Sequence, residues 1–532
     1  MKPKYRNYLT NLLFPAFVFG SITGTLTAVV VLLYKLCAKY VIAFSEKGYH
    51  YLREHLVYVP IVLIVLFGIA WLFAFLYKKT PNLRGGGIPT TIGVLRGIIS
   101  FEWIRNLFGV FFLSLTTFLI GVPLGNEGPS VQMGAAVGRG AVFSFAKKHR
   151  AWDRYSMTGG ACAGFSVATG APVSGMLFAI EEAHQRVSPM ILIVSATSVL
   201  FANVTSTLLA PVLGVSTRLF ADFQLQALNV GDLWIPVVVG LFVGLFAVAF
   251  LKYFQAIQTL VSKTLSKIPH AVRIFAILAV TVVLGLCSIE YVSTGHELIL
   301  ELFGGVMPIG ILLLILLVRS TMTLSANAVG ITGGTFIPIL ALGAVLASAL
   351  GNAMTSVFGL STEYSTAILV LGITACISGM MKMPLTAILF SIEALSCYQN
   401  IPHVIAAVTV SFTITELFGA KSVGDHVLEH RIESLNEGKT AKVIDTFVTV
   451  QKDAFAIGKQ VRDIFWPANL FVLSVKHDQK HGAQVDGHGG KELREGDVLH
   501  VRYSTYDEPI SKAELIAIVG EQEYSEDETD II

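Results

Sequence analysis

The stretch Gly125-Asn126-Glu127-Gly128-Pro129-Ser130 places an acidic residue between glycines in a long apolar region. A carboxylate at membrane depth costs about 3 kcal/mol on insertion scales, so its presence indicates a function. Glycine removes side-chain bulk, and Pro129 suits the first turn of a helix. We therefore expect a loop that delivers Glu127 to the positive end of a helix, where free N–H groups attract anions. A solvated turn with an acidic N-terminal cap is the alternative interpretation of this stretch alone.

The composition indicates an integral membrane protein with many spans. Of the 532 residues, 54% are hydrophobic and 14% are charged, and the mean hydropathy is +0.68. Gly, Pro, Ser and Thr are too frequent for simple lipid-facing helices and favour broken helices around a cavity. Apolar runs long enough to suggest membrane helices cover residues 12–36, 57–76, 107–120, 233–250 and 401–417. We expect an amphipathic connection at residues 40–55 between the first two spans.

Charged residues predict the orientation. Basic residues gather at 2–6, 78–84 and 147–154, and the positive-inside rule places these ends in the cytoplasm. We expect a multi-pass protein of the cell membrane with a cytoplasmic N-terminus and a cytoplasmic C-terminal region. The formal net charge of +2 gives no indication of nucleic-acid binding.

Two further glycine-rich breaks interrupt apolar sequence and end on a proline. They are Arg84-Gly85-Gly86-Gly87-Ile88-Pro89-Thr90 and Gly333-Gly334-Thr335-Phe336-Ile337-Pro338. A glycine run can expose successive N–H groups to an anion, although a single such run is more often a plain turn. Three breaks in one membrane domain predict broken helices whose positive ends converge on one site.

An internal repeat divides the apolar region into two homologous halves, at 10–215 and 230–425. The repeat is carried by two pairs of segments roughly 210 residues apart. These pairs are 172–181 with 384–393, and 129–135 with 338–344. Duplicated halves with broken helices are typical of transporters whose site lies at the repeat interface. We expect the halves to be inverted, which the sequence alone does not establish.

Adjacent glutamates behave differently within the repeat. Glu181 corresponds to Glu393, whereas Glu182 corresponds to Ala394. We interpret Glu181 and Glu393 as structural, for example as caps at helix ends. Glu182 lies about 100° further round the helix and is a candidate for proton handling, with a solvated helix end as the alternative.

The composition changes after Glu429, where charged residues become frequent. We predict strands at 448–450, 471–475 and 498–503 and helices at 459–465 and 511–515, which together form a small α+β domain. The predicted boundaries are a linker at 431–442, the domain at 443–519 and an acidic, disordered tail at 520–532. His477, His481 and His488 flank glycine-rich turns without cysteine partners, so a solvated hairpin is favoured over a metal site.

The three breaks resemble the signature motifs of the CLC chloride channel and transporter family, in order and spacing, across about residues 10–430. The resemblance implies an all-α polytopic fold, a homodimer with one pathway in each subunit, and transport of chloride or other small anions together with protons. Glu127 matches the gating glutamate, and Glu182 matches the internal glutamate that exchanges protons with the cytoplasm. The anion path would be lined, mostly by backbone groups, by Gly85, Gly86, Gly87, Ile88, Gly125, Asn126, Gly128, Gly334, Thr335 and Phe336.

Three departures from the family pattern leave the mechanism open. The usual serine of the first break is Gly86, and the usual tyrosine of the central site falls at Gly424. Both side-chain donors to a central anion are thereby missing, which favours a passive, voltage- or ligand-regulated chloride channel as one alternative to an antiporter. Asn126 stands where chloride members usually carry Lys or Arg and resembles the fluoride/proton antiporter branch, which is a second alternative.

The C-terminal region is similar to the RCK C-terminal (TrkA-type) domain, on Ile457-Gly458-Lys459 and the stretch 493–499. That resemblance implies a regulatory ligand, for which cyclic di-AMP is a candidate, and no cofactor is required. HExxH and GxSxG motifs are absent from the sequence, so an intramembrane enzyme is not indicated.

Overall fold

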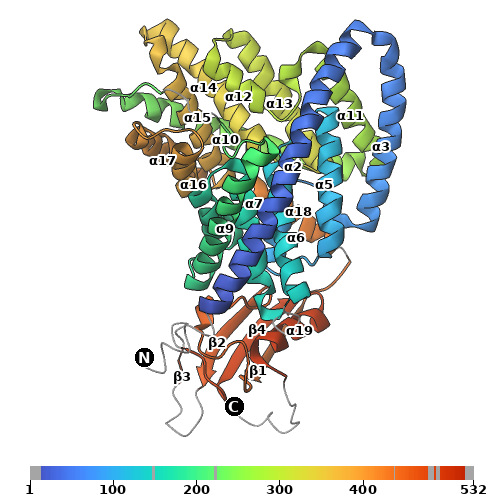
Figure 1. The fold of residues 1–532 in the computed structure, drawn as a ribbon, viewed down its shortest axis with the longest axis vertical. Coiled ribbons are helices and arrows are strands. Elements are labelled where there is room, and N and C mark those ends of the chain that lie inside the picture. The colour runs from blue at the N-terminus through green and yellow to red at the C-terminus, as the bar shows by residue number, and fades with distance from the viewer. Residues whose placement is uncertain are drawn as a thin grey trace.

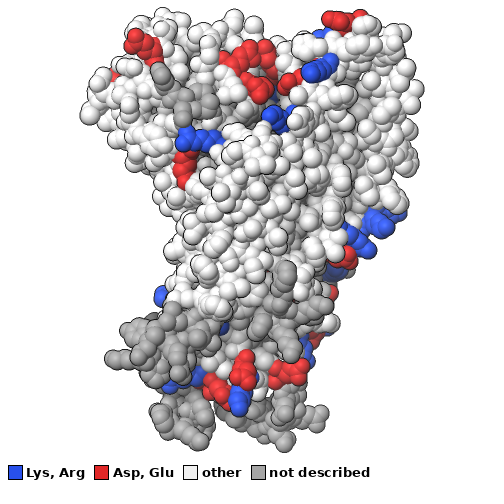
Figure 2. Space-filling view, viewed as in Figure 1, with Lys and Arg blue, Asp and Glu red and all other residues white. Residues whose placement is uncertain are grey.

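The computed structural model describes residues 13–145, 150–220, 225–436, 438–476, 485–486 and 492–521. A large helical domain stands on a small sheet domain, as Figure 1 shows, and both predicted parts are present. Nine of the described helices are long and apolar enough to cross a membrane. Figure 2 shows a broad band of uncharged surface across the helical domain, with charged side chains gathered towards its two ends. The chain is therefore a multi-pass membrane protein, as predicted.

The helical domain repeats one order of long and short helices. In both halves the first long helix packs on the last one: α2 on α9, and α10 on α17. The first half contains α2 (Phe14–Glu54), α3 (Val59–Lys79), α4 (Ile88–Leu95), α5 (Trp103–Ile120), α6 (Glu127–Phe145), α7 (Asp153–Thr169), α8 (Pro172–Phe178) and α9 (Pro189–Leu213). The second half contains α10 (Trp234–Thr259), α11 (His270–Cys287), α12 (His296–Gly304), α13 (Ile309–Val329), α14 (Phe336–Phe358), α15 (Ser365–Met381), α16 (Pro384–Glu393) and α17 (Ile401–Leu417), and α18 (Val423–Leu435) follows.

Glycines at matching positions bring the central helices of each half together. A Cβ on Gly134 of α6 would lie 2.0 Å from the carbonyl oxygen of Gly160 of α7, and the reverse distance is also 2.0 Å. In the second half, a Cβ on Gly343 of α14 would lie 2.7 Å from the carbonyl oxygen of Gly372 of α15, again in both directions. Small residues permit this close helix packing in membranes. The same contact in both halves confirms the repeat read from the sequence.

Glu181 and Glu393 cap each other's repeat. Glu181 accepts hydrogen bonds from the N–H groups of Leu385 and Thr386, at 2.8 and 2.7 Å, at the start of α16. Glu393 accepts from the N–H groups at positions 173 and 174, at 2.7 and 2.9 Å, at the start of α8. Because each acid follows one helix and caps the beginning of the other, α8 and α16 run antiparallel. Corresponding helices of an inverted repeat have this relation.

The first helix differs from its prediction. We expected a span followed by a separate amphipathic connection at residues 40–55, but α2 continues unbroken from Phe14 to Glu54. Within that connection Ser45 and Tyr49 are buried, and the Tyr49 hydroxyl donates to the carbonyl of Ile120 at 2.5 Å. These contacts stabilise the polar end of the helix, which the amphipathic pattern alone did not reveal.

The sheet domain contains four antiparallel strands in the order β1-β4-β2-β3. They are β1 (Lys442–Thr449), β2 (Leu470–Lys476), β3 (Val485–Asp486) and β4 (Val498–Thr505), and α19 (Glu508–Val519) follows. The helix predicted at 459–465 is wrong, because this segment forms only a 3₁₀ turn at Val461–Asp463 before extended backbone. His477, His481, His488 and the acidic tail beyond residue 521 lie outside the described residues.

We expect Glu393→Gln to lower the thermal unfolding midpoint of the purified protein. Glutamine replaces one carboxylate oxygen by an NH₂ group, which cannot accept a hydrogen bond from the start of α8. A backbone donor left without a partner away from water costs about 1–3 kcal/mol. The matched control is Glu416→Gln, since Glu416 is exposed and makes a surface ion pair with Lys382. Equal midpoints for the two variants, measured by tryptophan fluorescence in detergent, would contradict a stabilising role for the caps.

Candidate functional site

The three glycine-rich breaks meet inside the helical domain. Gly125 and Gly334 exchange two backbone hydrogen bonds, of 2.6 and 2.7 Å. The N–H of Gly85 donates to the carbonyl of Gly330 at 3.1 Å, and the N–H of Gly333 donates to the carbonyl of Gly85 at 3.3 Å. The third break is thereby bonded to both of the others, which is the convergence predicted from the sequence.

Close backbone approach explains why two of these positions are glycine. A Cβ on Gly128 would lie 1.9 Å from the carbonyl oxygen of Gly86, and a Cβ on Gly87 would lie 2.3 Å from the carbonyl oxygen of Gly128. Gly87 also has a φ of +77°, a conformation that glycine adopts without strain. A side chain at position 87 or 128 would force the first and second breaks apart.

A helix begins within each break, directly after its glycines or between them. α4 begins at Ile88, α6 at Glu127 and α14 at Phe336. The first N–H groups of a helix lack partners within it and carry partial positive charge, so three such ends together suit a small anion. The breaks and helix starts bring together all the candidate anion-lining residues: Gly85, Gly86, Gly87, Ile88, Gly125, Asn126, Gly128, Gly334, Thr335 and Phe336.

Glu127 lies at this junction and is fully buried. A Cβ on Gly125 would lie 2.7 Å from Glu127 Oε2, 3.3 Å from Pro338 and 3.4 Å from Ile337, so the carboxylate lies over the second break and beside the third. The backbone amides of Glu127 and Ile337 act on it electrostatically. No described residue completes a hydrogen bond of normal geometry with either carboxylate oxygen. The carboxylate is therefore held among helix N-termini without being locked to a described partner.

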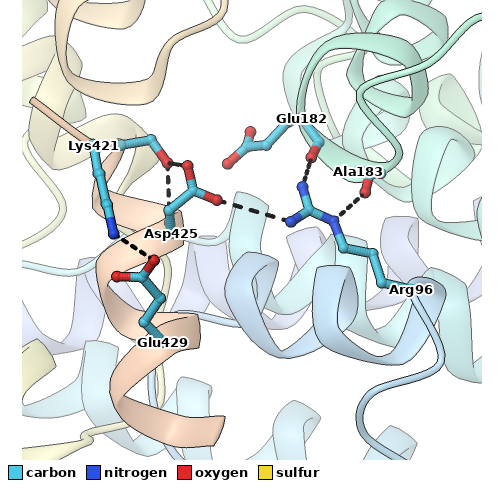
Figure 3. Close-up of polar contacts among 7 residues, drawn as sticks. Arg96, Glu182, Ala183, Lys421, Asp425 and Glu429 are labelled. Atoms are coloured by element: carbon cyan, nitrogen blue, oxygen red, sulfur yellow. Dashed lines mark hydrogen bonds and ion pairs between the residues drawn. The ribbon is translucent and has the colours of Figure 1, made fainter. Parts of the chain in front are cut away.

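Glu182 occupies a π-helical turn, Ala179–Ala183, at the end of α8. Its side chain is 5% exposed, and within the described chain neither carboxylate oxygen has a hydrogen-bond partner. Arg96 donates to the backbone carbonyls of Glu182 and Ala183, both at 2.9 Å, rather than to the carboxylate (Figure 3). The same guanidinium lies 3.9 Å from the Asp425 carboxylate. Glu182 thus has charged neighbours but keeps both carboxylate oxygens unbonded.

The two glycines that replace hydroxyl-bearing residues lie at different places. A Cβ on Gly86 would lie 3.5 Å from Asn327 Nδ2 and 3.6 Å from the carbonyl oxygen of Gly333. A Cβ on Gly424 would lie 3.0 Å from Glu182 Oε1. Gly86 therefore belongs to the breaks, whereas Gly424 lies beside Glu182, and neither glycine supplies a side-chain donor.

Sequence reasoning missed two polar residues near the site. Lys35 of α2 donates to the carbonyls of Val167 and Ala168, at 3.1 and 3.2 Å, and its charge acts on Glu127. Asn327 of α13 faces the first break and is 6% exposed. A cation in an apolar helix is itself a signal of function, and this signal would have found Lys35. Asn327 stands among other polar residues of α13 and carries no such signal.

The sheet domain is attached to the helical domain next to Glu182. The ring of Phe465 stacks on His184, with ring centroids 4.4 Å apart. The guanidinium groups of Arg154 and Arg186 lie 5.2 and 4.9 Å from the centre of the same ring. Phe465 is 5% exposed, so it is a buried anchor between the two domains. His184 follows Glu182 by two residues, which places the anchor on the segment that carries the acid.

Hydrogen bonds reinforce this anchor. The Tyr155 hydroxyl donates to the carbonyl of Asp463 at 2.6 Å and accepts from the N–H of Phe465 at 3.1 Å. Arg154 donates to the carbonyl of Trp466 at 2.7 Å. Beside these contacts lies an interdomain cavity of about 620 Å³, which Arg139, Arg154 and Glu514 help to line. Burial raises the pKa of the Glu514 carboxyl, and the two arginines oppose that shift.

Comparison with known proteins identifies the relatives of this chain. A family model described as "Voltage gated chloride channel" matches residues 62–416. The H(+)/Cl(-) exchange transporter ClcA of Salmonella arizonae is 27% identical over 441 residues, covering 80% of this chain and 90% of ClcA.

Solved structures with the same fold include transporters of two anions. A slow cyanobacterial Cl⁻/H⁺ antiporter aligns with a TM-score of 0.72 and 22% identity, covering 79% of this chain and 99% of its own. A CLC-type fluoride/proton antiporter aligns with a TM-score of 0.63 and 20% identity, covering 76% of this chain and 96% of its own.

Proposed function

Because the chain belongs to the voltage gated chloride channel family, we propose that it exchanges chloride for protons across the membrane, with Glu127 as the moving gate. The observation that carries this proposal is the position of the Glu127 carboxylate at the junction of the three breaks. Its relative in Salmonella, a transporter named for H⁺/Cl⁻ exchange, supports the same activity.

The mechanism follows from the charges at the junction. The ionised carboxylate of Glu127 occupies a position suited to an anion, because helix N-termini attract both. Protonation removes the charge of the side chain, which then moves aside for chloride. The carboxylate returns only when the proton and the anion have left, and this couples their movements. Since backbone dipoles rather than a fixed cation hold the anion, it is also able to leave.

We assign proton transfer between the site and the cytoplasm to Glu182. Its carboxylate is buried, and both its oxygens are available because no described residue bonds them. It lies on the side of the helical domain that carries the sheet domain, next to His184 and Phe465. The basic cluster at 78–84 supports a cytoplasmic N-terminus and a cytoplasmic C-terminal domain.

We further infer a homodimer with one pathway in each subunit. Large apolar side chains stay exposed on α8, α9, α16 and α17, where a second copy is able to cover them. Examples are Val173, Leu192, Leu200, Leu385 and Ile405.

Two alternatives rest on particular residues. A passive chloride channel is favoured by Gly86 and Gly424, which add no side-chain donor for a central anion. A fluoride/proton antiporter is favoured by Asn126, whose buried Oδ1 has no hydrogen-bond partner among the described residues. Both alternatives keep the fold and differ in what moves with the anion.

We propose that residues 443–519 form a regulatory domain of the RCK C-terminal type, between a linker at 431–442 and an acidic tail at 520–532. The Phe465 anchor supports this, because it joins the domain to the segment that carries Glu182. The interdomain cavity is large enough for a small regulatory ligand, for which cyclic di-AMP is our candidate.

Chloride gradients across proteoliposomes test the gate. We expect wild-type protein to move protons when chloride flows, and Glu127→Gln to abolish proton movement while chloride flux continues, because glutamine carries no exchangeable charge. The control is Glu363→Gln, at an exposed position. A Glu127→Gln variant that still moves protons against their gradient would contradict the proposal that Glu127 is the gate. Chloride flux without protons in the wild type favours the channel, and proton movement driven only by fluoride favours the fluoride antiporter.

Glu182→Gln is expected to slow proton movement by about 100-fold, the contribution of a positioned proton-transfer group, while chloride flux falls far less. External pH and chloride are recorded together from the same liposomes. Glu429→Gln is the matched control, because Glu429 lies nearby but makes only an exposed ion pair with Lys421 (Figure 3). Unchanged proton flux in Glu182→Gln would make this residue structural.

Phe465→Ala is expected to release the sheet domain, since removing a buried phenylalanine costs about 3–5 kcal/mol. Limited proteolysis should then cleave the domain from the helical part faster. The transport rate should change while the ratio of chloride to protons stays the same. Phe471→Ala is the control, because Phe471 lies in the same domain and is 66% exposed. Identical cleavage and transport in both variants would show that the anchor has no regulatory effect.

A further inference from the structure

The middle glycine of the first break is not required by the backbone. Gly85 and Gly87 have φ angles of +82° and +77°, whereas Gly86 lies outside the left-handed region. A Cβ on Gly86 would meet nothing nearer than 3.5 Å, which is ordinary van der Waals contact. The structure therefore has space for a side chain at position 86, although the residue there is glycine.

Asn327 reaches the same point from another helix. It lies in α13, three residues before Gly330, the left-handed glycine that ends this helix. Its Nδ2 atom is the nearest heavy atom to a Cβ placed on Gly86, at 3.5 Å, and the carbonyl of Gly333 follows at 3.6 Å. The amide thus lies where the first and third breaks meet.

The Asn327 side chain is buried without full satisfaction. It is 6% exposed, and its Oδ1 atom has no hydrogen-bond partner in the described part of the chain. Oδ1 is an acceptor and cannot bind an anion itself, so the group that suits an anion is Nδ2, which lies at the first break beside position 86. An amide has two N–H donors, and rotation of the group presents them to different neighbours.

We propose that Asn327 donates a hydrogen bond to the transported anion at the first break, in place of the hydroxyl that position 86 lacks. This inference rests on the proposed function, because it needs an anion at the junction of the breaks. The neutral amide adds a directed donor without a fixed charge, so the halide is bound and still released. An ionised carboxylate at the same position would repel the anion instead.

Chloride binding to the full-length protein in detergent, measured by isothermal titration calorimetry, tests this donor separately from transport. We expect Asn327→Leu to weaken chloride binding by about tenfold or more, the effect of losing a hydrogen bond to a charged group. Asn327→Asp, which keeps the shape of the side chain, should weaken it as well. The control is Asn203→Leu, since Asn203 is exposed on α9.

Rescue separates a ligand role from a packing role. Gly86→Ser has space for its Cβ, and in the Asn327→Leu background it should restore most of the lost affinity by supplying a hydroxyl donor. Unchanged chloride affinity in both Asn327 variants, or loss of affinity without rescue, would overturn the proposal. If the wild type binds chloride with this dependence on Asn327 but moves no protons in liposomes, exchange fails as the function while the donor role stands.

Discussion

The site depends on the contact between backbones at Gly86, Gly87 and Gly128. The carbonyl oxygen of Gly86 lies where a Cβ at position 128 would be, and the carbonyl oxygen of Gly128 lies where a Cβ at position 87 would be. Only this approach lets α4, α6 and α14 begin around one point, so that their unpaired N–H groups act together. The paired hydrogen bonds between Gly125 and Gly334 then fix the second break on the third. An anion site built from backbone dipoles therefore requires close backbone packing, and glycine permits this packing because it has no Cβ.

The acidic residues of the helical domain divide according to their partners. Glu181 and Glu393 each accept hydrogen bonds from helix N-termini and are thereby held in place. Glu127 and Glu182 are more deeply buried than this pair, but no described residue completes a hydrogen bond of normal geometry with their carboxylates. With the hydroxyl groups of Thr386 and Ser174, each of the two capping carboxylates accepts three hydrogen bonds and is fixed in position. An unbonded carboxylate gives up no such bonds when it moves or takes up a proton. The repeat in the sequence already separated Glu182 from the capping pair, since Glu182 corresponds to Ala394.

The sequence predicted the convergence of the breaks, the repeat and the capping pair, because these follow from motifs and matched spacing. It did not predict the continuation of α2 to Glu54, which rests on tertiary contacts such as that of Tyr49 with Ile120. The helix predicted at 459–465 is absent for the same reason. The N–H of Phe465 donates to Tyr155 and its ring stacks on His184, and both of these residues belong to the helical domain. Asn327 escaped notice because its neighbour Gly86 is far away in the chain, and no spacing rule links them.

The turn at Ala179–Ala183 carries or adjoins three functional groups: the capping Glu181, the unbonded Glu182 and His184, which contacts the sheet domain. Successive helical residues point about 100° apart, so fixing Glu181 on α16 turns Glu182 away from that helix. The wider π-helical turn, closed by the bond from the N–H of His184 to the carbonyl of Ala179 at 3.1 Å, sets the ring of His184 against Phe465. π-Helical turns are rare and concentrate at functional sites. Because the repeat cap, the unbonded acid and the domain anchor share this turn, the backbone that positions Glu182 is also the backbone to which the sheet domain is attached.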